Sequence, residues 1–547
     1  MHPTPRNFIA VVLACLMAGL AWAGEGGTGP GPASLLPPLV AVALALATKK
    51  VEASLFTGVV VGAIVASWPD PFAAAEGLAT YGASAVGFDL TGDTITFDSG
   101  HLEVTLFSLL VAATVGVVSR GGGTRALVRK VEGVAKNARG AGVASWLAGG
   151  IVFFDDYANC LVVGNAMGPL CDRFGVSRAK LAYIVDSTAA PVASLALVST
   201  WVGYEIGLIH DGLAAVGSDQ SALTVYIASI PYRFYSLFTV VFVGMLAWSC
   251  RDFGPMRAYE EQARRRVAEP ESASSGPATG SIWLGIVPVA ALVVVTMAVL
   301  YIGGRLAMGE AAAGAPLFEI LGASNPFRAM LIASATGYAL ALGLGLRALA
   351  PRDLWRASLH SGGAVAKALV VLYLAWMLGS AIEATSASTY LIGLLGDAVP
   401  GAVLPTVTFL LAAAIAFATG TSWGTMGILF PIVVPMAVTL EGTVPGAVLY
   451  GTTAAVLAGA CFGDHTSPIS DTTVLSSLGS GVDVVTHVRT QLPYALATGT
   501  VAVLVGYLPA GFGVSPWILL PAGMVLCALG LLLVPEVPPR SEELSAH

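Results

Sequence analysis

Charged residues are scarce in this chain. Only 11% of its 547 residues are Asp, Glu, Lys or Arg, whereas a soluble domain carries about 25%. Hydrophobic residues make up 56%, and the mean hydropathy is +0.80. This composition excludes an ordinary soluble domain and predicts an all-α polytopic membrane protein.

Cysteine is scarce as well. The six cysteines are scattered singly, without a CxxC pair and without the His and Cys spacing of a metal site. They give no disulfide framework and are typical of small apolar fillers. We therefore expect no resident cofactor.

The N-terminus has the pattern of a secretory signal. Arg6 precedes an apolar run over 8–20, and Ala21-Trp22-Ala23 follows as a small-residue cleavage site. The pattern predicts a signal peptide over 1–23. An uncleaved first helix is the alternative.

Apolar segments of about 17–25 residues mark the spanning helices. Two longer pairs are interrupted, 141–170 with 179–207 and 403–439 with 447–478. Together they predict about 11 spanning helices after removal of the signal peptide. The simple spans are expected near 33–48, 52–68, 102–118, 224–249, 281–302, 326–346, 364–383, 487–507 and 515–534.

Basic residues give the orientation, because cytoplasmic loops are enriched in Lys and Arg. Three apolar blocks separate Arg139 from Arg251, although both residues belong on the cytoplasmic side by this rule. The parity is restored if 141–170 is a re-entrant hairpin. Asp155 and Asp156 then lie at its tip.

Four polar stretches interrupt these apolar segments. An ionised side chain at the bilayer centre costs roughly 2.5–3.5 kcal/mol, so intramembrane acids indicate a functional site. Such acids in broken spans are typical of a transporter. The stretches are FFDDYAN (153–159), DSTAAP (186–191), TGTSWGT (419–425) and GDHTSPISD (463–471).

The same order of features occurs twice. Residues 417–423 correspond to 153–159, and 464–468 correspond to 186–191, at an offset of roughly 265–280 residues. The sequence therefore predicts two inverted repeats with re-entrant hairpins and broken helices. We expect a first repeat over 24–249, a cytoplasmic linker loop over 250–280, a second, inverted repeat over 281–508, and an extra C-terminal helix and tail over 509–547.

The first repeat offers two groups of candidate ligands. One of Asp155 and Asp156 can cap a helix, and the other can bind a cation or a proton with Asn159 one turn later. Asp186 is followed by Thr188 and by a proline that breaks the helix, so hydroxyl and backbone oxygens lie beside a carboxylate. That set suits a small hard cation such as sodium.

The second repeat has similar chemistry. Asp464, Ser467 and Asp471 combine acids with a hydroxyl at a predicted break, and Thr421 and Ser422 offer hydroxyls in the second hairpin. We place the sodium site in the region of Asp186 and Asp464. A proton and a sodium ion compete for the same carboxylate oxygens, and this competition produces exchange.

At these residues the chain resembles the NhaC family of sodium/proton antiporters. Four stretches carry the resemblance: FFDDYANCLVVGNAMGPL, AYIVDSTAAPVASLALVSTWVGYEIG, TGTSWGTMGILFPIVVPMA and GACFGDHTSPISDTTVLSS. The resemblance covers about 33–508. It implies a bacterial inner-membrane, multi-pass carrier with two inward-pointing hairpins, two unwound helices and an elevator-like or rocking movement. The site residues that it implies are Asp155, Asp156, Asn159, Asp186, Ser422, Asp464 and Asp471.

Three functions compete. We expect a sodium/proton antiporter, and the alternative is a sodium- or proton-coupled carrier of an organic acid or amino acid. Only Lys367 and Arg233 supply positive charge in or near the spans, which weakens an anionic substrate. An intramembrane aspartyl protease, an enzyme, is disfavoured because Cys461 replaces a glycine of its GxGD signature. The expected partners are a small cation and the lipid bilayer, without nucleic acid, and a homodimer is one option.

Overall fold

The computed structural model describes residues 31–537 except 49, 91–94, 133–134, 267–280, 316, 388–389, 391–399 and 442–445. The predicted signal peptide over 1–23 lies outside the described residues, as do residues 538–547 of the predicted tail. Within the described ranges the regular secondary structure is helical except for one short antiparallel pair, β1 (Phe88–Asp89) with β2 (Thr96–Phe97).

The prediction of an all-α polytopic membrane protein is confirmed. Among the described residues, seven helices are long and apolar enough to cross a membrane, and a bent pair over 222–249 raises the number to eight. Four shorter apolar helices accompany them. The seven are Gly100–Arg120, Ile282–Ala312, Pro326–Gly345, Gly401–Thr419, Ser422–Glu441, Ala447–Thr466 and Val484–Gly511.

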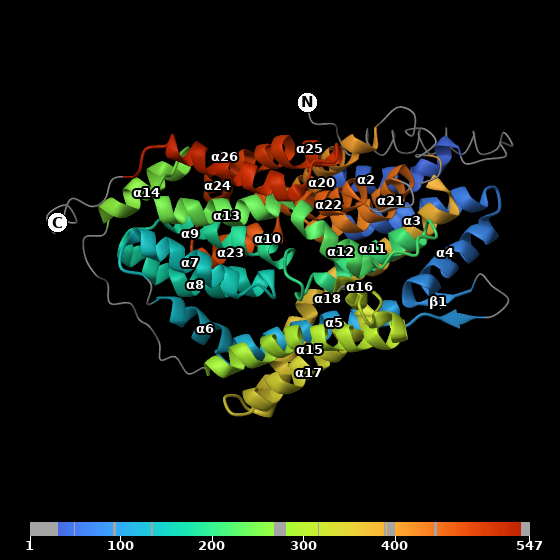
Figure 1. Cartoon of the computed structure of the whole chain (residues 1–547), viewed down its shortest axis with the longest axis horizontal. Coiled ribbons are helices and arrows are strands. Elements are labelled where there is room, and N and C mark those ends of the chain that lie inside the picture. The colour runs from blue at the N-terminus through green and yellow to red at the C-terminus, as the bar shows by residue number, and fades with distance from the viewer. Residues whose placement is uncertain are drawn as a thin grey trace.

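The first half contains a helical hairpin followed by a broken helix (Figure 1). The hairpin consists of α7 and α8, and the broken helix consists of α9, the short α10 and α11. The helices of this half are η1 (Pro32–Leu35), α2 (Leu36–Thr48), α3 (Val51–Ser67), α4 (Pro71–Val86), α5 (Gly100–Arg120), α6 (Gly123–Glu132), α7 (Ala138–Ile151), α8 (Asp156–Phe174), α9 (Arg178–Thr188), α10 (Ala190–Ala193), α11 (Val202–Ala214), α12 (Ala222–Ser229), η2 (Ile230–Tyr232) and α13 (Phe234–Ser249).

The second half has the same order of elements. Here α20 and α21 form the hairpin, and α22 and α23 form the broken helix. The helices are α15 (Ile282–Met308), η3 (Gly309–Ala312), α16 (Leu317–Gly322), α17 (Pro326–Gly345), α18 (Pro351–Ala384), η4 (Gly401–Val403), α20 (Leu404–Thr419), α21 (Ser422–Glu441), α22 (Ala447–Thr466), α23 (Asp471–Ser480), α24 (Val484–Val501), η5 (Ala502–Tyr507), α25 (Leu508–Gly511) and α26 (Pro516–Leu532).

The local sequence explains where helices begin and end at the second hairpin and the second break. Ser470 caps α23 by accepting a hydrogen bond from the backbone of Thr473. Gly420 joins α20 to α21 with φ +70°, and a Cβ there would lie 2.7 Å from the backbone oxygen of Ile469. Both the left-handed conformation and the close approach require glycine.

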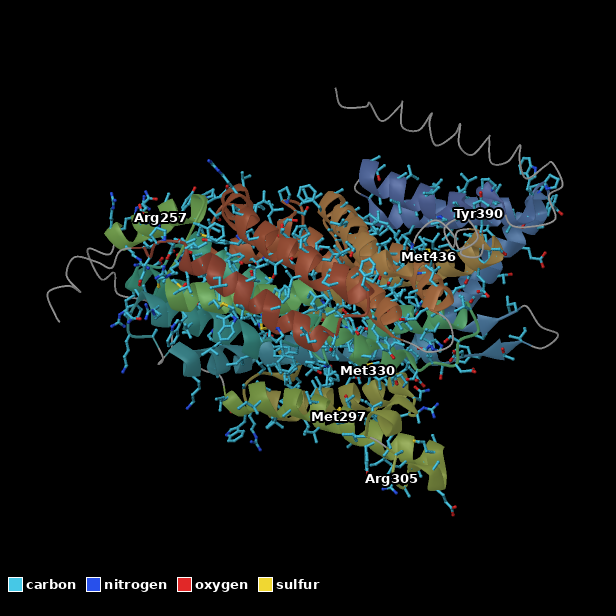
Figure 2. The ribbon with its side chains drawn as sticks, turned by 45° about the horizontal axis from the view of Figure 1, so that its top comes forward. Arg257, Met297, Arg305, Met330, Tyr390 and Met436 are labelled. Carbon is cyan, nitrogen blue, oxygen red and sulfur yellow. The ribbon has the colours of Figure 1, made fainter. Side chains whose placement is uncertain are left out.

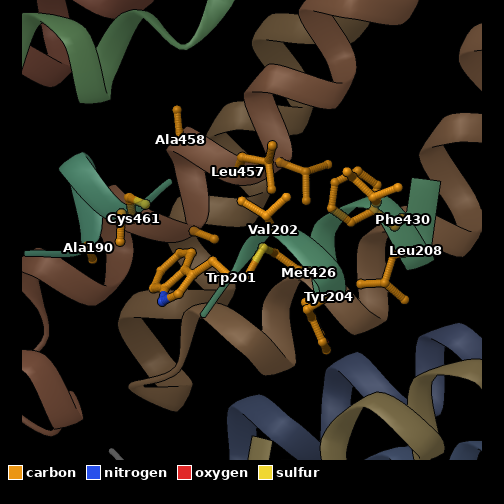
Figure 3. Packing of buried hydrophobic residues seen from close by; sticks show 14 of the residues in the cluster. Ala190, Trp201, Val202, Tyr204, Leu208, Met426, Phe430, Leu457, Ala458 and Cys461 are labelled. Atoms are coloured by element: carbon orange, nitrogen blue, oxygen red, sulfur yellow. The ribbon is translucent and has the colours of Figure 1, made fainter. Parts of the chain in front are cut away.

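The two halves pack reciprocally: the second part of each broken helix lies against the hairpin of the other half. The half-helix α23 packs on α8, where a Cβ on Gly164 would lie 2.7 Å from the backbone of Gly479. Likewise α11 packs on α21, and Figure 3 shows Val202 beside Met426. The Tyr204 hydroxyl adds a hydrogen bond of 2.5 Å to the Trp423 carbonyl. The predicted inverted repeats would produce such an exchange of partners.

The expected linker loop over 250–280 needs correction, because helix α14 (Pro255–Arg266) occupies part of it. Glu260 on its inner face is buried and accepts a hydrogen bond of 2.7 Å from the Ser177 backbone. The Lys180 ammonium lies 2.7 Å from the Asp252 carboxylate and 3.6 Å from that of Glu260. The arginine-rich composition of this segment indicated an exposed loop, so the pattern did not reveal these inward-facing residues. Residues 267–280 lie outside the described residues.

The described part of the C-terminal tail lies against the same helix. The Val537 amide donates to the Cys250 carbonyl (3.1 Å), and the Arg257 guanidinium donates to the Pro535 carbonyl (3.0 Å). Helix α14 thus contacts both α9, which carries Asp186, and the described part of the tail up to Val537.

Replacement of Glu260 by Gln should weaken the pH dependence of stability. Burial raises the pKa of Glu260, and Lys180 offsets only part of this effect. The stabilisation by its proton is complete below the ordinary glutamate pKa of about 4.3 and is lost as the pH rises through the raised value. Thermal unfolding in detergent should therefore show a smaller loss of stability with rising pH in Glu260→Gln than in the wild type. The half-buried neighbour Glu261, which pairs with Arg257 at 3.0 Å, is the control: Glu261→Gln should keep the wild-type slope. Equal slopes in all three proteins would contradict the assignment.

Candidate functional site

The tip of the first hairpin holds two buried acids with different roles. Asp155 caps α8, since its carboxylate accepts a hydrogen bond of 2.6 Å from the Ala158 backbone. Asp156 is the first residue of that helix and is 4% exposed, and its Oδ2 has no hydrogen-bond partner. Asp156 therefore has a buried carboxylate oxygen that accepts no hydrogen bond.

Asn159 connects the hairpin to the first broken helix. Its side-chain amide donates to the carbonyls of Gly149 (2.7 Å), Thr188 (2.8 Å) and Val152 (3.3 Å). A Cβ on Gly149 would overlap the Thr188 side chain, so the two segments touch. The Thr188 hydroxyl donates within its own helix, whereas Asn159 Oδ1 is buried without a partner.

The unwound stretch between α10 and α11 closes on the same tip. The Thr200 amide donates to the Phe154 carbonyl (3.1 Å). Thr200 Oγ1 is buried without a hydrogen bond of good geometry, like the free oxygens of Asp156 and Asn159. The Thr200 hydroxyl nevertheless faces the Asp155 carboxylate, and the Trp201 indole N–H faces Asp156. Oxygen ligands of this kind suit a small hard cation.

Asp464 lies in the last turn of α22, at the second break. Its two carboxylate oxygens accept hydrogen bonds from Ser470 (2.7 Å) and Thr472 (2.9 Å). The Ser467 hydroxyl donates to the Phe417 carbonyl (2.7 Å) and so fixes the break against the second hairpin. Hydroxyl groups, which both donate and accept, thus surround this acid.

Asp186 has a different environment, because nitrogen donors face it. His487 Nε2 and Gln491 Nε2 each lie 3.1 Å from Asp186 Oδ2. The Thr473 hydroxyl lies 3.3 Å from the same oxygen and 3.2 Å from the Asp464 carbonyl, so it links the two breaks.

His465 forms the opposite side of the Asp186 environment. Its Nε2 lies 3.9 Å from Asp186 Oδ2 and 3.1 Å from the Ser187 hydroxyl. The Tyr235 hydroxyl pairs with Nδ1 at 2.7 Å, and the ring stacks on Tyr183. Asp186 therefore lies between two buried histidines.

His487 and Gln491 were missed by the sequence reasoning. A signal was present: the two residues stand four apart in the first turns of α24, so they share one face of that helix. Placed at the expected start of a simple span, they were indistinguishable from interfacial residues.

The other candidates make structural bonds. The Thr421 hydroxyl accepts from the Gly424 amide (3.3 Å), and the Ser422 hydroxyl donates to the Ala460 carbonyl (3.4 Å). Asp471 is exposed on the protein surface and accepts from Tyr157 at 3.4 Å. The structure joins Asp186 to Asp464 through Thr473 and groups the other first-repeat candidates around Asn159.

One more buried ion pair lies among the spanning helices. Arg233 and Glu205 are both 0% exposed, and their closest charged atoms are 3.5 Å apart. The guanidinium also lies over the Tyr226 ring at 4.5 Å. The positive charge of Arg233 is therefore already neutralised. Within the described ranges, no three His, Cys, Asp or Glu side chains are placed to hold a metal ion by themselves.

The hairpins, the broken helices and the intramembrane acids define a multi-pass membrane transporter. The chain belongs to the Na+/H+ antiporter family, whose model matches residues 192–512. This match confirms the predicted resemblance to sodium/proton antiporters.

The chain is also similar to several known proteins. The chain is 32% identical over 510 residues to an uncharacterized protein of Haemophilus influenzae, covering 92% of this chain and 94% of the relative. It is 31% identical over 176 residues to the malate-2H(+)/Na(+)-lactate antiporter of Bacillus subtilis, a match that spans 25% of this chain and 36% of that protein. Among solved structures, MtrF of Neisseria gonorrhoeae has the same fold, with a TM-score of 0.56, 16% identity, and coverage of 93% of this chain and 95% of MtrF.

Replacement of Asn159 by Ala should loosen the tip of the first hairpin. Three buried carbonyls would lose their donor, and each unsatisfied group costs about 1–3 kcal/mol. We expect a clearly lower midpoint of thermal unfolding in detergent. Asn165, on the same helix, is exposed and bonds only to Leu161, so Asn165→Ala should stay near the wild type. Equal midpoints for the two variants would show that Asn159 does not hold the tip.

Proposed function

We propose that this protein exchanges sodium for protons across a bacterial inner membrane. The observation that carries the proposal is the presence of two unlike environments at the hairpin tip and the broken helices. At the first hairpin tip, buried oxygens accept no hydrogen bond. The Asp186 carboxylate, in contrast, is surrounded by nitrogen donors, and Thr473 connects Asp186 to Asp464.

The cation belongs at the oxygen-rich side. Asp156 and Asn159 each bring a buried oxygen that lacks a donor, and Thr200 adds a hydroxyl from the unwound stretch. A dehydrated sodium ion would satisfy these oxygens, and the charges of Asp155 and Asp464 would favour it.

The proton belongs at the donor-rich side. A sodium ion at Asp186 would have to displace the donors of His487, Gln491 and Thr473, so the sequence-based placement of sodium at Asp186 is less favourable. Imidazole is the side chain best suited to take up and release protons near neutral pH. Helix α24 begins on the side that the positive-inside rule makes cytoplasmic, and His487 lies in its first turn. We therefore assign proton transfer to Asp186 with its two histidines.

Carriage of an organic acid is the second candidate, because the Bacillus subtilis relative is described as a malate and lactate antiporter. An organic anion needs a fixed positive charge, and Arg233 is paired with Glu205.

Peptide hydrolysis needs two aspartates that share a water molecule, but Thr473 joins Asp186 to the backbone carbonyl of Asp464, not to its carboxylate. Sodium/proton exchange therefore fits this arrangement better than either alternative.

Replacement of Asp464 by Asn should abolish sodium-driven proton movement. The variant loses one of the negative charges that stabilise a cation in low dielectric, and we expect the rate to fall by more than about tenfold. The assay is a pH dye in proteoliposomes during a sodium jump, with potassium, lithium, lactate and malate as a panel. The exposed Asp219 gives the control, since Asp219→Asn should change the rate by less than about twofold. A response of the wild type to lactate or malate but not to sodium would overturn the proposal.

Replacement of His487 by Gln should separate proton coupling from cation binding. Glutamine keeps a donor toward Asp186 but cannot carry a proton. We expect sodium-driven proton movement to fall by about tenfold or more, while proton-independent exchange of labelled sodium for sodium stays within about twofold. His360, exposed on α18, is the control as His360→Gln. An equal loss of both exchange modes would indicate a structural role for His487.

A further inference from the structure

An apolar cavity of about 360 Å³ lies between the α15–α17 pair and the first broken helix. In Figure 1 this pair forms one edge of the molecule, and Figure 2 labels Met297 and Met330 on it. The cavity wall combines α11, α12, α15, α16, α17 and the unwound stretch. Its lining residues are Leu197, Val202, Ile206, Leu223, Ile227, Thr296, Met297, Leu300, Leu317, Leu321, Pro326 and Met330.

The lining offers nothing to a polar ligand. Thr296 is its single polar side chain, and the Thr296 hydroxyl already donates to the Leu292 carbonyl at 2.7 Å. A water molecule occupies about 30 Å³ and needs two to four polar partners, so the volume suffices for water but the chemistry does not. If a cavity of this size were empty, the atoms along its whole wall would lose dispersion contacts on one side. Hydrocarbon is the occupant that restores them.

The cavity is continuous with the surface of α15 that faces lipid. Val294 and Leu306 on that helix are 65% and 79% exposed. At the cavity itself, Leu317 and Leu197 are 59% and 45% exposed, so its rim is open. Both α15 and α17 lie in segments that are long and apolar enough to span the bilayer. The hydrocarbon within reach is therefore that of the bilayer.

We propose that the acyl chain of a bilayer lipid enters this cavity and packs against the first broken helix. Arginines follow the C-terminal end of α17, so the positive-inside rule places Pro326, at its N-terminal end, toward the outer leaflet. The chain comes from a lipid of that leaflet.

The bound chain touches the segment that completes the candidate site. Leu197 lies in the unwound stretch, and Val202 begins α11 two residues after Thr200, whose amide holds the hairpin tip at Phe154. A lipid tail in this place braces the unwound stretch against α15 and α17. This inference depends on the membrane location and not on the identity of the transported ion.

Photolabelling tests the proposal. The full chain is reconstituted in liposomes that contain a phospholipid with a diazirine on its acyl chain, irradiated, and mapped by peptide mass spectrometry. Val202 and Ile206 are 1% and 0% exposed, so label on them reports a chain inside the cavity, whereas label on Leu306 reports surrounding lipid. We expect label at all three residues in the wild type.

A matched pair of tryptophans supplies the control. Leu300→Trp fills the cavity and should reduce labelling of Val202 and Ile206 by about fivefold or more, while Val294→Trp, on the lipid-facing side, should leave it within about twofold. Met297→Trp replaces Leu300→Trp if gel filtration shows that the latter misfolds. Label on Leu306 without label on Val202 and Ile206, or equal labelling in both tryptophan variants, would overturn the proposal. Failure of sodium to move protons would leave this result unaffected.

Discussion

The structure depends on one constraint: backbone groups exposed where a helix breaks inside a bilayer must find partners within the protein. Side chains and amides of neighbouring broken segments provide them. The Asn159 amide serves the ends of α7 and α9, the Thr200 amide serves the tip of the first hairpin, and the Ser467 hydroxyl serves the end of α20. Each hairpin therefore needs a broken helix beside it, and the polar residues of the breaks are first of all requirements of the fold.

The character of the candidate site follows from how these hydrogen bonds are distributed. Asn159 uses its amide nitrogen on three carbonyls, which leaves its oxygen without a donor, as Asp156 Oδ2 is, three residues earlier on the same helix. Buried acceptors without partners are costly in low dielectric. At Asp186 the opposite holds, because three donors converge on one carboxylate oxygen. Under the proposed function, a cation would relieve the first environment and protonation would change the second, so the two ions would occupy different places.

Much of this arrangement was predictable because acids in apolar sequence are expensive. Asp155, Asp186 and Asp464 stood out for that reason, and all three lie at helix ends where the sequence predicts breaks. Partners far apart in the chain were not predictable. The pairing of Asp186 with His487 depends on how α9 and α24 pack, which no local pattern encodes. Helix α14 was missed because its inward face, with Met256 and Glu260, is narrow and surrounded by arginines.

The charges inside the protein limit the transported substrate more strongly than the fold does, since one architecture can have many functions. An anionic substrate would have to open the pair between Arg233 and Glu205, which is closed to water. Opening it leaves a buried carboxylate unpaired, and losing one partner of a buried pair costs about 3–5 kcal/mol. A cation at the hairpin tip carries no such cost, because Asp156 and Asn159 already present free oxygens. Under the proposed function, the oxygens of Asp156 and Asn159 that accept no hydrogen bond, and the charge of Glu205 beside Arg233, favour a cation over an anion.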